Sequence, residues 1–232
     1  MAARLLSNAP MEEAPYQPQP DAEPAVPAGP LVASAPRPGG WRDGLPELAG
    51  SLVTLREFRM EDATSLFAAM TNGDVTRFIS PPPNTVDGFE RFIAWTHRQR
   101  ATGQSLAFAI VERGSDTAIG LFQVRALDPD FGTAEWGFAI ASEFWGRGMF
   151  LDGAPLVIEF AFDVIGVHRL EARAAVSNTR GQSALKKLGA VREGVLRKSF
   201  LRYGEFHDQA LWALLADEWY DAQMPRESQV IH

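Results

Sequence analysis

The chain has 232 residues, of which 46% are hydrophobic and 22% charged, and this balance is typical of a globular protein with a sizeable core. Its 22 basic and 29 acidic residues give a formal charge of −7, which disfavours non-specific binding to nucleic acid or to an anionic membrane surface. The absence of cysteine excludes disulfides, thiolate metal sites and a cysteine nucleophile.

The first 46 residues contain ten of the sixteen prolines and few large apolar side chains. Such a segment cannot offset its ordering entropy by burial, so residues 1–46 are predicted to be a disordered, proline-rich tail. One domain over residues 47–222 and a short tail over 223–232 complete the expected organisation. The sequence shows neither a secretory signal pattern nor an apolar run near the roughly 20 residues of a membrane span. We therefore expect a cytoplasmic protein without membrane contact.

The predicted elements of the domain follow from hydrophobic periodicity and turn residues. In chain order, strands are predicted over residues 51–58, 106–111, 118–125, 134–140, 168–176, 190–200 and 206–214. Helices are predicted over residues 60–71, 84–101, 148–165, 179–189 and 215–222. Pro155 lacks an amide inside the third helix, which predicts a kink or bulge there. The succession predicts an α/β fold in which helices cover a mixed, mainly antiparallel sheet.

The stretch EFWGRGMF, residues 143–150, joins the predicted strand 134–140 to the long helix. Gly146 and Gly148 allow the chain to turn with its amides in one direction, and Arg147 adds a positive charge. The helix that follows contributes the partial positive charge of its N-terminus. These features suit a phosphate group. An ordinary turn from strand to helix would need the same glycines, so the motif alone leaves both interpretations open.

The strand before this stretch has two contrasting faces. Its period of two places Trp136, Phe138 and Ile140 on one face, and Glu135 with two very small residues on the other. A face that combines a carboxylate with small residues would suit a groove for an extended ligand. A solvent-facing strand edge fits the same pattern.

Three stretches together carry a resemblance to a known family: WGRGMF, EFAFDVIGVHRLEARAAVSNTRGQSALKKLGAVREGVLR and GEFHDQALWALLADEW. From about Leu52 to Trp219 the chain resembles the GCN5-related N-acetyltransferases (GNAT), in the RimJ/RimL-like branch of ribosomal-protein N-terminal acetyltransferases. The resemblance implies a six- or seven-stranded sheet that splays between its fourth and fifth strands, with acetyl-CoA in the cleft. It also implies an enzyme that transfers an acetyl group to a primary amine, most directly the N-terminal amine of a protein.

The resemblance also implies which residues bind the co-substrate. The family's pyrophosphate loop falls on the stretch that ends at Phe150, with Gly148 as its essential glycine. The residues around the diphosphate are then Gly146, Arg147, Gly148, Met149 and Phe150. Backbone amides of Phe138, Ala139 and Ile140 would hold the pantetheine arm, and Asn178 would contact the cofactor.

Three positions named here depart from the pattern of the family. Phe150 stands where glycine or alanine is usual, so its ring must turn away from the phosphates or the loop must shift. Gly181 stands where the branch has a serine that accompanies Asn178. Leu185 replaces a tyrosine that protonates the leaving thiolate in many relatives.

The implied mechanism is direct attack of the amine in a ternary complex. Glu135 is the candidate general base, acting through a water molecule, and its place on the small-residue face supports this role. Ser183 or a water is the candidate for returning a proton to the thiolate. The histidines lack the spacing of metal ligands, so no metal is expected.

Alternatives remain open at this point. The acceptor could be a small amine such as a polyamine, an amino acid or an antibiotic, or the chain could be a non-catalytic module that binds acyl-CoA. The loops around residues 76–84 and 198–206 are expected to decide the acceptor. A monomer or a homodimer is expected.

Overall fold

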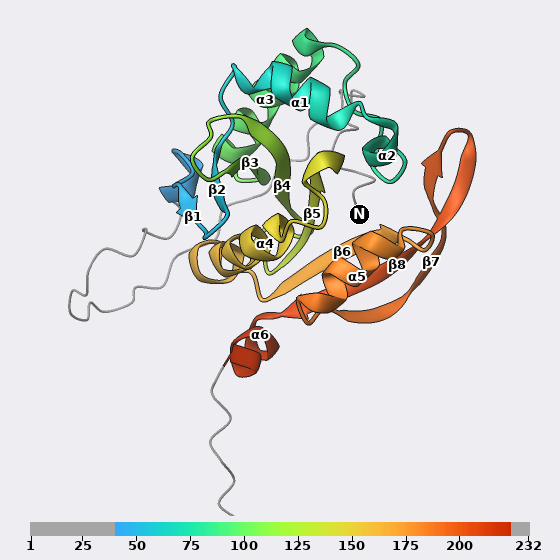
Figure 1. Ribbon diagram of the computed structural model, residues 1–232. Coiled ribbons are helices and arrows are strands. Elements are labelled where there is room, and N and C mark those ends of the chain that lie inside the picture. The colour runs from blue at the N-terminus through green and yellow to red at the C-terminus, as the bar shows by residue number, and fades with distance from the viewer. Residues whose placement is uncertain (1–39, 224–232) are drawn as a thin grey trace, which may run out of the picture.

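The structure is a computed structural model that describes residues 40–223. A single sheet organises the fold, with strand order β1-β2-β3-β4-β5-β6-β8-β7 (Figure 1). Its strands are β1 (Leu48–Ala49), β2 (Val53–Glu57), β3 (Ser105–Glu112), β4 (Ala118–Ala126), β5 (Thr133–Ile140), β6 (Arg169–Ala175), β7 (Val191–Arg202) and β8 (Glu205–Leu215). In the described chain every neighbouring pair is antiparallel except β5 and β6. The mixed, mainly antiparallel sheet is confirmed, and the two-residue β1 makes it eight-stranded.

Helices cover both faces of this sheet (Figure 1). They are α1 (Asp62–Met70), α2 (Gly73–Thr76), α3 (Val86–Ala101), α4 (Met149–Glu159), α5 (Thr179–Lys187) and α6 (Ala216–Gln223). The short α2 is absent from the sequence prediction, because four residues carry no periodic signal. After α4 the helix continues as a π-helical segment, Phe160–Ile165. The bulge that was expected at Pro155 therefore begins five residues later, at Phe160.

The alternation along β5 separates two hydrophobic cores. Trp136 and Ile140 belong to the core on the side of α4, together with Ile158 of that helix. Ala139 belongs to the core on the other side, with Phe89 of α3. The two faces predicted from the period of two are therefore confirmed, and each is covered by its own helices.

The sheet opens between β5 and β6. These strands pair only where residues 133–135 lie beside residues 169–171. On its other side β5 stays paired with β4 as far as Ile140. From Trp136 onward one backbone edge of β5 therefore has no strand partner among the described residues. Because β1 was not predicted, β5 and β6 are the fourth and fifth predicted strands, and this opening is the splay expected between them.

The packed domain begins before residue 47, the predicted boundary. Trp41 is 4% exposed and lies edge-on to Phe131, with 5.7 Å between the ring centroids. The free energy gained by burying so large an apolar side chain offsets the entropy lost when the residues around it are ordered. Residues 1–39 and 224–232 lie outside the described residues, so the two tails stay predictions. No helix within residues 40–223 is long and apolar enough to cross a membrane.

Candidate functional site

The opening between β5 and β6 leads into a cleft of about 640 Å³. Its walls come from the end of β5, the loop before α4, the start of α5 and the segment around α2. Nine residues that were singled out from the sequence line it, namely Phe138, Ala139, Ile140, Gly146, Gly148, Met149, Phe150, Asn178 and Ser183. The fold thus brings together residues from three separate stretches of the chain. Two other predicted site residues, Arg147 and Glu135, do not line the described part of this cleft.

The loop before α4 has the backbone of an anion site. Gly146 has φ +77° and Gly148 has φ +84°, a left-handed conformation that other residues seldom adopt. Gly148 is the N-cap of α4, and its carbonyl accepts the first helical hydrogen bond, from Asp152. The amides of residues 149–151 precede that bond and have no partner within the helix. Unpaired amides and the positive end of the helix dipole therefore meet at the cleft.

Asp152 fastens this helix start to the sheet. Its carboxylate accepts hydrogen bonds from the backbone amides of Ser51 (3.0 Å), Leu52 (2.8 Å) and Val53 (3.0 Å). Gly50 is needed beside it, because a Cβ there would lie 2.2 Å from the Asp152 carboxylate. The sequence contains no local signal for this contact, since about a hundred residues separate its partners.

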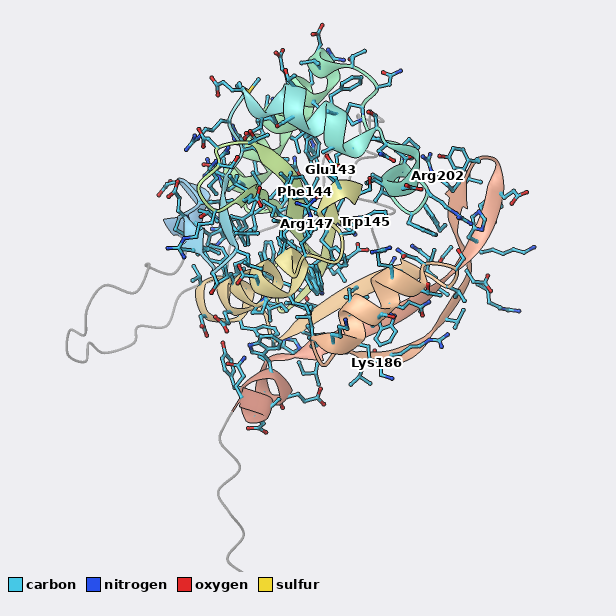
Figure 2. All side chains as sticks on the ribbon, viewed as in Figure 1. Glu143, Phe144, Trp145, Arg147, Lys186 and Arg202 are labelled. Atoms are coloured by element: carbon cyan, nitrogen blue, oxygen red, sulfur yellow. The ribbon has the colours of Figure 1, made fainter. Side chains whose placement is uncertain are left out.

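Arg180 of α5 lies beside Trp145, an aromatic residue of the segment before α4. Its guanidinium lies 4.4 Å from the centroid of the Trp145 ring, across the opening of the sheet. Arg147 lies 5.2 Å from the Phe144 ring centroid, and both residues are labelled in Figure 2. Arg147 is not among the described residues that line the cleft. Arg180 lines the cleft, whereas Arg147 does not, so the role predicted for Arg147 stays a prediction. The position of Arg180 could not be found from the sequence, because it depends on how α5 packs.

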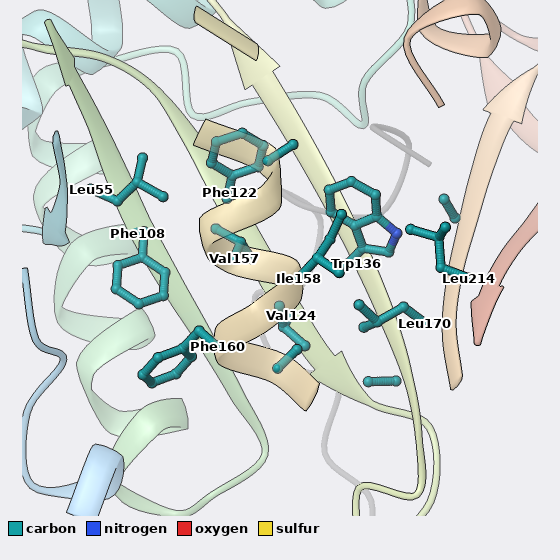
Figure 3. Packing of buried hydrophobic residues seen from close by; sticks show 14 of the residues in the cluster. Leu55, Phe108, Phe122, Val124, Trp136, Val157, Ile158, Phe160, Leu170 and Leu214 are labelled. Carbon is teal, nitrogen blue, oxygen red and sulfur yellow. The ribbon is translucent and has the colours of Figure 1, made fainter. Parts of the chain in front are cut away.

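Phe150 turns away from the loop and into the core. Its ring centroid lies 4.2 Å from that of Phe138 and 6.1 Å from that of Phe122. Beneath them, Phe122 and Trp136 belong to a buried aromatic layer that packs against α4 (Figure 3). The structure agrees with the first of the two alternatives posed by this residue: the half-buried ring packs against the core, and Gly146 and Gly148 keep their left-handed conformations.

The free edge of β5 presents the backbone groups of alternate residues. The Ala141 amide donates to the Ile119 carbonyl on β4, at 2.8 Å. In an antiparallel ladder every second residue bonds to the same neighbour, so the Ala139 amide also points to β4, away from the opening. Phe138 and Ile140 direct their backbone groups to the opening. The indole of Trp145 donates to the Ile140 carbonyl at 2.8 Å, which agrees with that direction.

Asn178 closes the N-terminus of α5. Its side-chain oxygen accepts a hydrogen bond from the Gly181 amide at 2.9 Å. A Cβ at Gly181 would lie 2.6 Å from the side-chain nitrogen of Asn178. Glycine at the position of the branch's serine therefore leaves room for this cap, and the side-chain NH₂ group of Asn178 takes no part in it.

Glu135 lies at the closed end of the opening, where β5 still pairs with β6. Its side chain is 4% exposed and forms an ion pair with Arg125, its cross-strand neighbour on β4. Arg173 of β6 approaches the second carboxylate oxygen at 3.9 Å. The predicted base is thus enclosed with two guanidinium groups. Arg125 follows from the sequence only once the register between β4 and β5 is known.

The cleft is locally positive although the chain as a whole is negative. Arg77, Arg180 and Lys187 line it, with Asp74 as the acidic residue among the lining, so the balance is three positive charges to one negative. A site of this kind suits an anionic ligand such as a diphosphate. Among residues 40–223 no group of three or more carboxylate or imidazole side chains is placed to hold a metal ion.

An opened mixed sheet with an anion loop at the head of α4 is the arrangement of an acetyltransferase. The acetyltransferase (GNAT) domain matches residues 53–191, well over half of the chain. The protein belongs to this family and is an acyltransferase enzyme with N-acetyltransferase activity.

The chain is also similar to several known proteins. The uncharacterised N-acetyltransferase p20 of Bacillus licheniformis is 27% identical over 168 residues, which cover 72% of this chain and 94% of p20. The [ribosomal protein uS5]-alanine N-acetyltransferase of Escherichia coli is 23% identical over 124 residues, which cover 53% of this chain and 62% of that one. The structure of Mycobacterium smegmatis RimJ in complex with CoA-disulfide has a TM-score of 0.68 at 23% identity and covers 78% of this chain and 90% of RimJ.

Proposed function

We propose that the protein transfers the acetyl group of acetyl-CoA to the N-terminal amine of a protein. The observation that carries the proposal is the loop at the head of α4, whose unpaired amides and left-handed glycines open onto a positive cleft beside the free edge of β5. In this arrangement the diphosphate lies on the loop and the pantetheine arm runs along β5. A protein acceptor is supported by the name of the Escherichia coli relative. A cytoplasmic location belongs to the same proposal.

The reaction needs one bond formed and one broken. The amine nitrogen bonds to the thioester carbonyl carbon, the C–S bond breaks, a base takes the amine proton, and the thiolate takes a proton as it leaves. In our proposal the backbone N–H groups of Phe138 and Ile140 hold the arm and polarise the carbonyl. Holding both reactants in one cleft supplies much of the acceleration, because positioned groups reach high effective concentrations.

Glu135 and Ser183 have different roles in the proposed mechanism. Ser183 lines the cleft and is our candidate for returning the proton to the thiolate. Glu135 is enclosed beside Arg125 and Arg173, so it acts through a water in our proposal, with the two guanidinium groups fixing the direction of its carboxylate. Glu135→Gln is therefore expected to lower kcat at least tenfold and to leave the affinity for acetyl-CoA unchanged. Unchanged turnover would remove Glu135 from the mechanism.

The deciding experiment is a screen of amines with the purified full chain and acetyl-CoA. Thiol release and the mass of the product are followed for peptides with different N-terminal residues, for polyamines and for free amino acids. An acetylated peptide N-terminus is the expected result. Products from small amines alone would refute the protein acceptor. Tight binding of acetyl-CoA without any product would indicate a binding module in place of an enzyme.

A further inference from the structure

A second pocket of about 300 Å³ adjoins the cleft. It lies between α2 and the hairpin formed by β7 and β8, and it shares Arg77, Phe78 and Ser177 with the lining of the cleft. Phe78 and Phe200 contribute apolar surface to it. The two loops expected from the sequence to decide the acceptor, residues 76–84 and 198–206, meet at this pocket.

Arg202 is the unusual group in its wall. It is only 9% exposed, and Figure 2 shows it reaching from the hairpin toward α2. Its Nε donates to the Thr76 carbonyl at 2.9 Å and its Nη2 to the Tyr203 hydroxyl at 3.1 Å, so both acceptors are neutral. Within residues 40–223 no carboxylate forms an ion pair with Arg202.

The comparison with Arg56 shows what Arg202 lacks. Arg56 is similarly buried, at 4% exposure, and both of its terminal nitrogens bond to the Asp62 carboxylate, at 2.7 and 2.8 Å. A buried guanidinium without an anionic partner is costly, because desolvation is not offset by an opposite charge. An anionic group in the adjoining pocket would supply the missing partner.

The other charges around the pocket favour the same ligand. Arg77 is exposed and lines the pocket as a second cation, stacked on Phe78 at 5.2 Å. Glu205 is the acidic residue of the described lining, and it forms no ion pair with either arginine within residues 40–223. Two cations face one anion beside apolar side chains. A planar carboxylate fits a guanidinium in two parallel hydrogen bonds, which a single point charge does not offer.

We propose that Arg202, assisted by Arg77, binds a carboxylate of the acceptor, and that the preferred acceptors are therefore amines that also carry a carboxylate. This inference rests on the proposed acetyl transfer and narrows its substrate class. The carboxylate has two sources with the same chemistry, an acidic side chain near the N-terminus of a peptide and the α-carboxylate of a free amino acid.

Matched pairs of acceptors test the proposal. Peptides with an amidated C-terminus carry glutamate or glutamine at positions 2, 3 or 4, and free phenylalanine is compared with phenethylamine. In the wild type the carboxylate member of at least one pair should have a kcat/KM about tenfold higher, which corresponds to about 1.4 kcal/mol. The type of pair that shows the preference identifies the source of the carboxylate.

Variants then locate the preference. Arg202→Gln should bring the ratio within a pair close to one, because only the carboxylate member loses its ionic partner, and Arg77→Gln should lower the ratio several-fold. Tyr203→Phe is the control, since it removes the hydroxyl that Arg202 contacts and keeps the charge, so the ratio should stay as in the wild type. Because each ratio is measured within one protein, a general loss of folded enzyme cancels.

Three results would overturn the inference. The first is no preference for the carboxylate member in any pair that is acetylated, and the second is a preference that survives Arg202→Gln. The third is weaker acetyl-CoA binding by Arg202→Gln, which would assign the arginine to the binding of acetyl-CoA. If the wild type acetylates none of these amines, the proposed transfer fails separately. Calorimetry of the same peptides with wild type and Arg202→Gln then decides the carboxylate site, and equal binding by both refutes it.

Discussion

Gly148→Ala tests whether the loop at the head of α4 holds the diphosphate. Gly148 has φ +84°, and alanine in the left-handed region costs about 1–2 kcal/mol. The added Cβ would lie 3.2 Å from the Cδ1 atom of Leu52. That side chain is 44% exposed and can move, so the steric contact adds little. The expected loss in the free energy of unfolding is therefore about 1–2 kcal/mol, almost all from the backbone.

Gly166→Ala is the matched control for this substitution. Gly166 has φ +88°, a Cβ there meets open space, and the residue lies away from the cleft at the end of the π-helical segment. Urea unfolding should show similar losses for both variants. Calorimetry with acetyl-CoA should show wild-type affinity for Gly166→Ala and an affinity at least about tenfold weaker for Gly148→Ala, since in the proposed binding mode the backbone of Gly148 contacts the phosphates and that of Gly166 does not. Equal affinities in the two variants would refute the placement of the diphosphate on this loop.

Three further predictions concern other contacts of the fold. Phe150→Ala removes a half-buried ring, so the free energy of unfolding should fall by about 2 kcal/mol in urea titrations. Calorimetry should show an acetyl-CoA affinity within about threefold of the wild type, because in our proposal residue 150 contributes only its backbone amide to binding. Asp152→Ala removes the acceptor of three backbone amides and should lower the free energy of unfolding by about 3 kcal/mol. The control Asp87→Ala, in the first turn of α3, should lower it by about 0.5 kcal/mol or less. Equal losses would contradict the anchoring role of Asp152. A hydrogen bond from Arg169 lowers the pKa of Glu193 below its ordinary value of 4.5. The ionised carboxylate therefore stabilises the fold fully above pH 4.5, and this contribution is lost as the pH falls through the lower pKa of the folded state. The melting temperature of Glu193→Gln should therefore change less than that of the wild type as the pH falls from 5 to 3, by a small amount because the pair is partly exposed.

Local pattern was enough to predict most of the framework. The strands and the longer helices follow from periods of two and of about 3.6, which depend only on near neighbours in the chain. The glycine loop was recognisable for the same reason, since left-handed backbone at Gly146 and Gly148 is a property of single residues. The two faces of β5 also follow from alternation, and they placed Glu135 on the side opposite Trp136.

Only the tertiary structure decided which groups meet. The register between β4 and β5 gives Glu135 its partner Arg125 and directs the amide of Ala139, which the sequence had assigned to the ligand, toward β4. The packing of α5 brings Arg180 to the anion loop, and the hairpin brings Arg202 beside Thr76, 126 residues earlier in the chain. Periodicity specifies which face of an element is buried, but it contains no information on which distant element covers that face. Strand order and the splay of the sheet supply that information, and they set the charge and shape of the cleft.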